Sequence, residues 1–275
     1  MTKPSYTELN KRLIPLIIDA GSAILEFFER DVQVDLKSDQ SPVTQADRVG
    51  ESIILNGLSA HWPEIDIIAE EMCSDGDFEK PGELFFLVDA LDGTKEFIAG
   101  HKDFTVNIAL IHNAKPIFGL VFAPALRKLF ASLEADRAGM ALIDHQQTTE
   151  DLNDLEFKEL RVREWPADGG VAVMSRSHGD DRSRAFLLSV GVSSTIAAGS
   201  SLKFCTVASG EADVYPRFQP TMEWDIAAGH AVLAAAGGVV VDVAGNEAQY
   251  GKFDEGFRNG DFIACGHGSL ARIMS

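Results

Sequence analysis

The sequence predicts an α/β fold built in two parts. Residues 1–156 combine two amphipathic helical patterns with a series of short apolar segments, which is typical of a mixed α+β unit. Residues 157–275 alternate strand and helix patterns, which is the rhythm of an α/β unit. The polar and acidic stretch at residues 145–159 separates the two patterns and is the expected domain junction.

In the first part, apolar residues at helical spacing predict a helix over residues 6–30, either kinked at Pro15 or starting near it. Thr44 and Asp47 form a capping signal, so a second helix is expected to follow. Short segments separated by Gly, Pro or Asn turns are the expected strands. They cover residues 65–68, 84–88, 104–111, 117–122 and 129–133.

The second part is expected to interleave strands with helices. The predicted strands cover residues 171–174, 194–197 and 238–243, and the predicted helices cover residues 181–189, 202–209 and 224–236. The last helix is rich in alanine, a strong helix former, and leads directly into the last of these strands.

The charge balance excludes some classes of partner. Against 24 Lys and Arg residues stand 42 Asp and Glu residues, so the formal charge is −18. That balance disfavours nucleic acid and anionic lipid. A small phosphate ester stays compatible, because bound cations can reverse the local field of an acidic protein.

The sequence is typical of a cytoplasmic protein. Cys73, Cys205 and Cys265 lie far apart, which disfavours a zinc site or a disulfide framework. The first residues carry no apolar signal stretch, and no apolar run reaches the length of a membrane span. No integral membrane segment is therefore expected, and no feature indicates an oligomeric state.

Two carboxylates, Asp89 and Asp92, follow an apolar strand pattern and come directly before Gly93 and Thr94. Desolvated carboxylates at a sheet edge favour a cation, and Mg²⁺ prefers such oxygen ligands. Glu70, just past another strand, and Asp225, near the start of a helix, offer further oxygen atoms. Taken singly, each acid is more often a cap or a turn residue, but together they favour a metal site.

Two segments are candidates for binding phosphate. Gly93 and Thr94 open a short helical segment, and residues 199–203 open another with two hydroxyls and the Lys203 ammonium. Either glycine can instead be a plain turn residue, and Ser200 a plain cap. Asp47 is a candidate proton acceptor that the Thr94 hydroxyl could link to water, although its spacing fits a helix N-terminal charge equally well.

Four ordered motifs resemble the lithium-sensitive, magnesium-dependent phosphatase superfamily that includes the inositol monophosphatases. They read SPVTQAD at residues 41–47, AEE at 69–71, DALDGT at 89–94 and WD at 224–225, and the resemblance covers nearly the whole chain. Within that superfamily the chain is most similar to the 3′(2′),5′-bisphosphate nucleotidases. That closer similarity rests on TKEF at residues 94–97, SRSH at 175–178, GSSLK at 199–203, TMEWD at 221–225 and GH at 229–230.

The resemblance implies a layered αβαβα sandwich with the active site between the two parts. It implies two or three Mg²⁺ ions shared by Glu70, Asp89, the backbone carbonyl of Leu91, Asp92 and Asp225. Asp47, Thr94 and Glu70 would position and deprotonate the attacking water. Gly93 and Thr94 would bind the scissile phosphate, while the nucleoside or its second phosphate would face Ser175, His178, Ser200 and Lys203.

The implied reaction is hydrolysis of the 3′-phosphate of adenosine 3′,5′-bisphosphate to AMP and phosphate, linked to sulfate assimilation and sensitive to lithium. An inositol monophosphatase or another sugar-phosphate phosphatase is the alternative. A non-catalytic nucleotide- or metal-sensing protein is a further one, for which Ala90, in place of the family's proline, is the hint. That replacement is expected to soften the loop by under roughly 1 kcal/mol without removing a ligand. The resemblance also leaves open a peripheral position at the inner face of the membrane.

Overall fold

The computed structural model of the protein describes residues 3–28, 34–36, 42–76, 78–144, 152, 155–175 and 181–274. Its helices are α1 (Tyr6–Phe28), α2 (Gln45–His61), α3 (Glu70–Ser74), α4 (Thr94–Ile98), α5 (Asp181–Ser189), α6 (Leu202–Ala208), α7 (Glu223–Ala235) and α8 (Leu270–Ile273). None of these described helices is both long enough and apolar enough to cross a membrane.

Two sheets contain most of the strands. A seven-stranded sheet, in spatial order, contains β3 (Asp66–Ala69), β4 (Leu84–Asp92), β5 (Thr105–His112), β6 (Lys115–Ala123), β7 (Lys128–Glu134), β8 (Arg137–Leu142) and β9 (Lys158–Leu160). A five-stranded sheet contains β11 (Val192–Ala198), β10 (Gly170–Ser175), β12 (Val214–Arg217), β16 (Phe262–Gly266) and β14 (Gly238–Val241). Two short pairs join β1 (Val34–Leu36) to β2 (Pro42–Thr44), and β13 (Thr221–Met222) to β15 (Arg258–Asn259).

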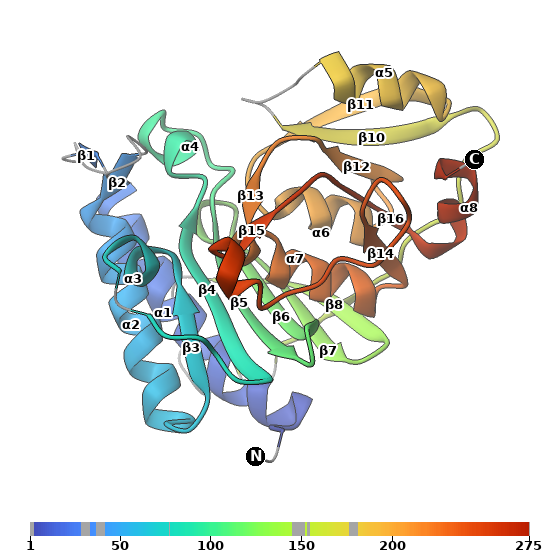
Figure 1. Ribbon diagram of the computed structural model, residues 1–275. Helices are drawn as coiled ribbons and strands as arrows, with labels where there is room; N and C mark the ends of the chain where they lie inside the picture. Colours follow the sequence, from blue (N-terminus) through green and yellow to red (C-terminus); the bar gives the residue numbers. More distant parts are fainter. Residues whose placement is uncertain are drawn as a thin grey trace.

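The elements stack in five layers (Figure 1). Helices α1 and α2 cover one face of the seven-stranded sheet, and α6 and α7 lie between the two sheets. Helix α5 covers the outer side of the five-stranded sheet, against β11 and β12. The expected αβαβα sandwich is therefore confirmed.

The first helix shows why the sequence pattern was informative. Helix α1 buries a stripe of apolar side chains, including Leu13, Ile17 and Ile24, against α2 and the seven-stranded sheet. It begins at Tyr6 and runs through Pro15, so the alternative that it starts near Pro15 is wrong. Residues 29 and 30 of the predicted helix lie outside the described residues.

Helix α7 is buried almost all round because it packs on both sheets. It crosses the seven-stranded sheet closely at β6, where a Cβ on Gly119 would clash with the backbone oxygen of Ala228. Only glycine allows this approach. The close packing fixes the position of α7 and therefore of Asp225 in its first turn.

Most predicted elements are confirmed, including the five strands now labelled β3–β7 and the helices α5, α6 and α7. The structure also contains elements that were not predicted, namely the strands β1, β2, β8, β9, β12, β13, β15 and β16 and the short helices α3 and α8. Of the expected junction, residues 145–151, 153 and 154 lie outside the described part of the chain. Strand β9 follows residue 156 yet pairs with β8 in the first sheet, and the boundary between residues 156 and 157 stays a prediction.

Candidate active site

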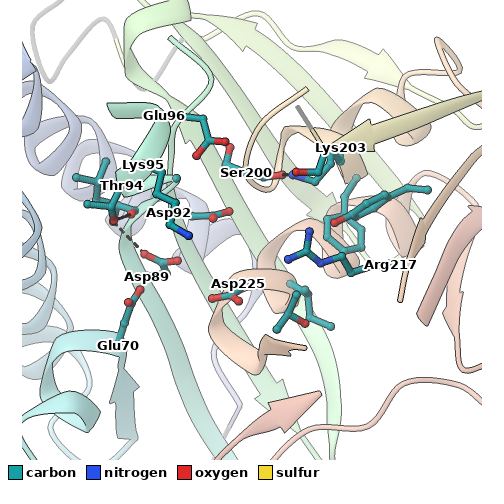
Figure 2. Close-up of a pocket in the computed structure, with 17 residues that line it drawn as sticks. Glu70, Asp89, Asp92, Thr94, Lys95, Glu96, Ser200, Lys203, Arg217 and Asp225 are labelled. Carbon is teal, nitrogen blue, oxygen red and sulfur yellow. Dashed lines mark hydrogen bonds between the residues drawn. The ribbon is translucent and has the colours of Figure 1, made fainter. Parts of the chain in front are cut away.

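The carboxylates of Glu70, Asp89 and Asp225 form a compact group, which we call the acidic cluster. One carboxylate oxygen of each residue lies within 4.8 Å of those of the other two. The three side chains come from α3, β4 and α7, so distant stretches of the chain meet here (Figure 2). The sequence predicted this meeting, whereas the role of these residues as metal ligands stays a prediction.

The pairing of two strands brings the first two acids together. Strands β3 and β4 are parallel, and Ala69 at the end of β3 pairs with Val88 of β4. The carboxyl ends of adjacent parallel strands lie at the same edge of a sheet. Glu70 and Asp89 follow Ala69 and Val88 directly, so both acids lie at that edge.

A bulge in β4 brings Asp92 to the same side as Asp89. Asp89 pairs with Asn107 of β5 and Asp92 pairs with Thr105, so three steps on one strand oppose two on the other. Side chains three residues apart in a regular strand face opposite sides, and one extra residue restores the same side. Both aspartates therefore line one cavity.

Hydrogen bonds hold two of these acids in place. Asp89 Oδ1 accepts the N–H of Leu91 at 3.0 Å, a hydrogen bond within the bulge that fixes the Asp89 side chain. Asp225 Oδ2 accepts the N–H of Met222 at 2.7 Å, at the start of α7. The hydroxyl of Ser201 donates to the backbone oxygen of Asp225 at 2.8 Å, which ties α7 to the residue preceding α6.

The electrostatics of the acidic cluster fit a divalent cation. Burial raises the pKa of Asp89 well above its usual value, and the charges of Glu70, Asp92 and Asp225 raise it further. Burial raises the pKa of Asp225 in the same way, with Asp92 and Glu70 adding to it. Buried carboxylates that repel one another are costly unless a cation neutralises them. Their hard oxygen atoms are the donors that Mg²⁺ prefers.

Asp47 is buried and contacts the cavity through Thr94. The Asp47 Oδ2 atom accepts the N–H of Thr44 at 2.7 Å and the Thr44 hydroxyl at 2.6 Å, within the capping box of α2. Its Oδ1 atom accepts the hydroxyl of Thr94 at 3.1 Å. Burial is the main reason why the pKa of Asp47 is raised, against the hydrogen bonds from Thr44 and Thr94. Asp47 is therefore both the third residue of the capping box, in which Thr44 is the N-cap, and a partner of a cavity residue.

Gly93 allows the chain to turn between Asp92 and Thr94. Its φ of +94° lies in the left-handed region, which glycine adopts without the strain other residues experience. Thr94 then begins α4, and its hydroxyl also lies 3.2 Å from the backbone oxygen of Leu91.

The cavity beside the acidic cluster has a volume of about 270 Å³. The predicted site residues that line it are Glu70, Asp89, Leu91, Asp92, Gly93, Thr94, Ser175, Ser200, Lys203 and Asp225. His178 lies outside the described residues. Figure 2 shows Glu70 and Asp89 on one side of the cavity and two cations, Lys203 and Arg217, on the other.

Lys203 is buried and is held by its own loop. Its Nζ donates to the backbone oxygen of Ser200 at 2.6 Å and lies 5.5 Å from the ring centre of Tyr215. Burial lowers the pKa of Lys203 to about 8, although Asp92 opposes that shift. Ser200 has a φ of +45°, and its buried hydroxyl has no hydrogen-bond partner among the described residues.

Arg217 is a cavity residue that the sequence interpretation missed. It ends β12, and its Nε atom is buried without a hydrogen-bond partner in the part of the chain that the structure describes. In Figure 2 its guanidinium group points into the cavity, towards Asp225. An alternating Val-Tyr-Pro-Arg segment was the available signal, but β12 was not predicted.

The chain is similar to known proteins over most of its length. Residues 5–271 match the model of the inositol monophosphatase family. The 3′(2′),5′-bisphosphate nucleotidase CysQ of Escherichia coli strain K12 is 40% identical over 234 residues, which cover 84% of this chain and 89% of that protein. CysQ of Salmonella typhimurium strain LT2 is 39% identical over 242 residues, which cover 87% of this chain and 93% of the relative.

Solved structures show the same fold. The crystal structure of CysQ from Bacteroides thetaiotaomicron, a member of the inositol monophosphatase family, matches with a TM-score of 0.75 and 34% identity. That match covers 94% of this chain and 96% of the solved one. An IMPase from Thermotoga maritima matches with a TM-score of 0.73 and 24% identity over 95% and 93% of the two chains, which shows the fold alone.

Proposed function

This chain belongs to the inositol monophosphatase family, and from that premise we propose that it is a 3′(2′),5′-bisphosphate nucleotidase. The reaction would remove the 3′-phosphate of adenosine 3′,5′-bisphosphate and release AMP. The observation that carries this proposal is a cavity with the acidic cluster on one side and Lys203 and Arg217 on the other. One side suits the reacting phosphate, and the other suits a second phosphate that is kept.

The metal site of this proposal uses oxygen atoms alone. Its ligands would be Glu70, Asp89, the backbone oxygen of Leu91, Asp92 and Asp225, for two or three Mg²⁺ ions. Bound Mg²⁺ supplies positive charge that offsets the charge of the phosphate and lowers the pKa of coordinated water. The mutual repulsion of Asp89, Asp92 and Asp225 in the absence of a cation supports this assignment.

Residues of the chain would handle the proton of the attacking water. Because Thr44 occupies Asp47 Oδ2 with two donors, Oδ1 is the atom that receives the Thr94 hydroxyl. With its proton directed at Asp47, Thr94 Oγ presents its lone pairs to a water molecule in the cavity. As the water gives a proton to Thr94 Oγ, the original Thr94 proton would pass to Asp47 Oδ1, so Asp47 would be the final proton acceptor. Glu70 would offer a second acceptor on the cavity wall.

The opposite wall would hold the rest of the nucleotide. Arg217 carries donors suited to two oxygens of one phosphate. Its buried Nε atom has no hydrogen-bond partner among the residues that the structure describes, which leaves it available for that contact. Lys203 adds a second charge beside Ser200.

Phosphate release tests the proposal directly. Purified protein with Mg²⁺ is incubated with adenosine 3′,5′-bisphosphate or with inositol 1-phosphate. The variant Asp89→Asn, which lacks one carboxylate charge of the acidic cluster, serves as the matched control. We expect release from the nucleotide at a higher kcat/KM than from inositol phosphate, with no release in excess EDTA. Preference for inositol phosphate would favour a sugar-phosphate phosphatase, and nucleotide binding without release would favour a sensing protein.

A further inference from the structure

We propose that Glu51 is a positioning residue, which fixes Glu70 for metal binding by holding the first turn of α3. The inference rests on the proposed function, because that function assigns Glu70 to the metal site. Glu51 is itself distinct from the residues that line the cavity. It therefore acts through the backbone of another element.

Both oxygens of Glu51 bind backbone amides directly after Glu70. The Oε2 atom accepts the N–H of Glu71 at 2.8 Å, and the Oε1 atom accepts the N–H of Met72 at 2.9 Å. The Glu51 side chain is only 4% exposed, so neither bond competes with bulk water. A buried, two-point contact of this kind fixes both the position and the direction of the helix start.

Helix α3 depends on this contact because its own capping is weak. It is five residues long, and Ala69 at its N-cap makes no side-chain hydrogen bond. A helix this short is not stable alone, and its first N–H groups need acceptors. The negative charge of Glu51 also suits the amino end of a helix. Glu70 thus begins a helix that is capped from α2.

Burial and neighbouring carboxylates disfavour the charged form of Glu51. Burial raises the pKa of Glu51 to about 7, against the two backbone hydrogen bonds, and the charges of Glu71 and Glu70 raise it further. An apolar residue packed at the same position would avoid that cost. The hydrogen bonds to α3 are therefore the specific contribution of this glutamate.

Thr94 and Glu70 flank the proposed water site, and helix α2 contacts Thr94 through Asp47 and the helix that carries Glu70 through Glu51. Asp47 and Glu51 lie one turn apart on α2, and both are buried. Asp47 binds the Thr94 hydroxyl, and Glu51 binds the start of the helix that carries Glu70. Helix α2 consequently sets the spacing between Thr94 and Glu70. Metal sites are sensitive to such supporting contacts, whose loss weakens metal affinity by about 10–100-fold.

The test measures Mg²⁺ binding without substrate. Metal-stripped wild-type protein and Glu51→Gln are titrated with Mg²⁺, and the melting temperature is followed at each concentration. A glutamine can accept one of the two N–H groups, but its amide nitrogen would face the other donor. We expect the Mg²⁺ concentration at half of the melting-temperature rise to increase about 10–100-fold in Glu51→Gln. Excess Mg²⁺ should restore most of its kcat.

Ile54→Val is the matched control, because Ile54 is buried in the next turn of α2 and its truncation weakens packing alone. Its Mg²⁺ midpoint should stay within about twofold of wild type. An equal shift in both variants, or a wild-type midpoint in folded Glu51→Gln, would overturn the inference. If Glu51→Gln does not fold, Glu51→Asp, which is one methylene shorter, must show the same weakening. A wild-type protein that gains no stability from Mg²⁺ would instead refute the proposed function.

Discussion

Thr94 Oγ lies 3.1 Å from Asp47 Oδ1, although 47 positions separate the two residues in the sequence. The contact joins the first turn of α2 to the first residue of α4, directly beside the acidic cluster. Of this pair, Thr94 is the residue that lines the cavity. If the pair handles the attacking water, the hydroxyl is essential and the methyl group of Thr94 is not.

We therefore expect Thr94→Val, which keeps the shape but loses the hydroxyl, to lower kcat by about 10²–10⁴-fold. Thr94→Ser keeps the hydroxyl and should retain most of the activity. The measurement is kcat on adenosine 3′,5′-bisphosphate at saturating Mg²⁺, together with the Mg²⁺ midpoint from thermal unfolding. A valine variant with near wild-type kcat would show that Asp47 and Thr94 serve the fold alone.

Arg217 and Lys203 are expected to distinguish a bisphosphate from a monophosphate. Arg217→Met should raise KM for adenosine 3′,5′-bisphosphate by roughly 10–100-fold, the value of a lost charge-assisted hydrogen bond, while KM for 3′-AMP changes little. Steady-state kinetics on the two substrates provide the comparison, and Arg217→Lys tests whether charge alone suffices. Equal changes for both substrates would assign Arg217 to the reacting phosphate instead.

Lys203→Met should also raise KM more for the bisphosphate than for 3′-AMP. Because Lys203 Nζ donates to the backbone oxygen of Ser200, the variant should lose some stability as well. Thermal unfolding measured beside the kinetics separates the two effects. A loss of stability with equal KM changes for both substrates would leave Lys203 as a support for its loop.

The sequence was informative about elements with a strong local pattern. Helix α2 follows its capping signal, and β3 and β4 follow their apolar runs. Strand β12 escaped prediction because it is four residues long and contains Pro216, which argues against a central strand. Its pairing with β10 is limited to Val214, so Pro216 lies beyond that ladder.

Some residues of the candidate site could be identified from the sequence, and others depend on tertiary structure. The acids of the four motifs could be named from the sequence, because the resemblance supplied their order. Arg217 and Glu51 could not be named, since one depends on the missed strand β12 and the other on the packing of α2 against α3. The bulge between Asp89 and Asp92 was also invisible, because register depends on the partner strand β5.

The acidic cluster should cost stability when Mg²⁺ is absent. In Asp225→Asn, the amide oxygen can still accept the Met222 N–H, while the charge that repels Asp89 is removed. The metal-free variant is expected to melt above the metal-free wild type, by roughly 2–4 °C for each kcal/mol of repulsion relieved. Mg²⁺ should no longer stabilise the variant. The free energy of unfolding of wild type should instead rise by about 2.7 kcal/mol when the Mg²⁺ concentration is 100 times its dissociation constant. Thermal unfolding in EDTA and in Mg²⁺ measures both effects, and a less stable metal-free variant would contradict the repulsion.

His230 should make the protein lose stability in mild acid, independently of the active site. It lies in α7, is 8% exposed, and its Nδ1 atom is 2.8 Å from the Tyr250 hydroxyl. Burial lowers the pKa of His230 from 6.5 to about 4, with Glu247 raising it and Lys115 lowering it further. Between these values the unfolded chain binds a proton that the folded chain does not, so stability falls as pH drops from 6.5 to 4.

The full loss from His230 is about 3 kcal/mol, since one pKa unit corresponds to about 1.4 kcal/mol. Glu51 works in the opposite direction, because its raised pKa of about 7 favours the folded state as pH falls towards 4.5. The effect of His230 is therefore measured as a difference between wild type and a variant, in which the contribution of Glu51 cancels. The free energy of unfolding of wild type minus that of His230→Asn, whose amide can replace Nδ1 beside Tyr250, is followed from pH 7 to pH 4 in EDTA. That difference should shrink with acidification, because the variant has no imidazole to protonate. A difference independent of pH would show that the pKa of His230 is the same in the folded and unfolded states, so that burial does not lower it.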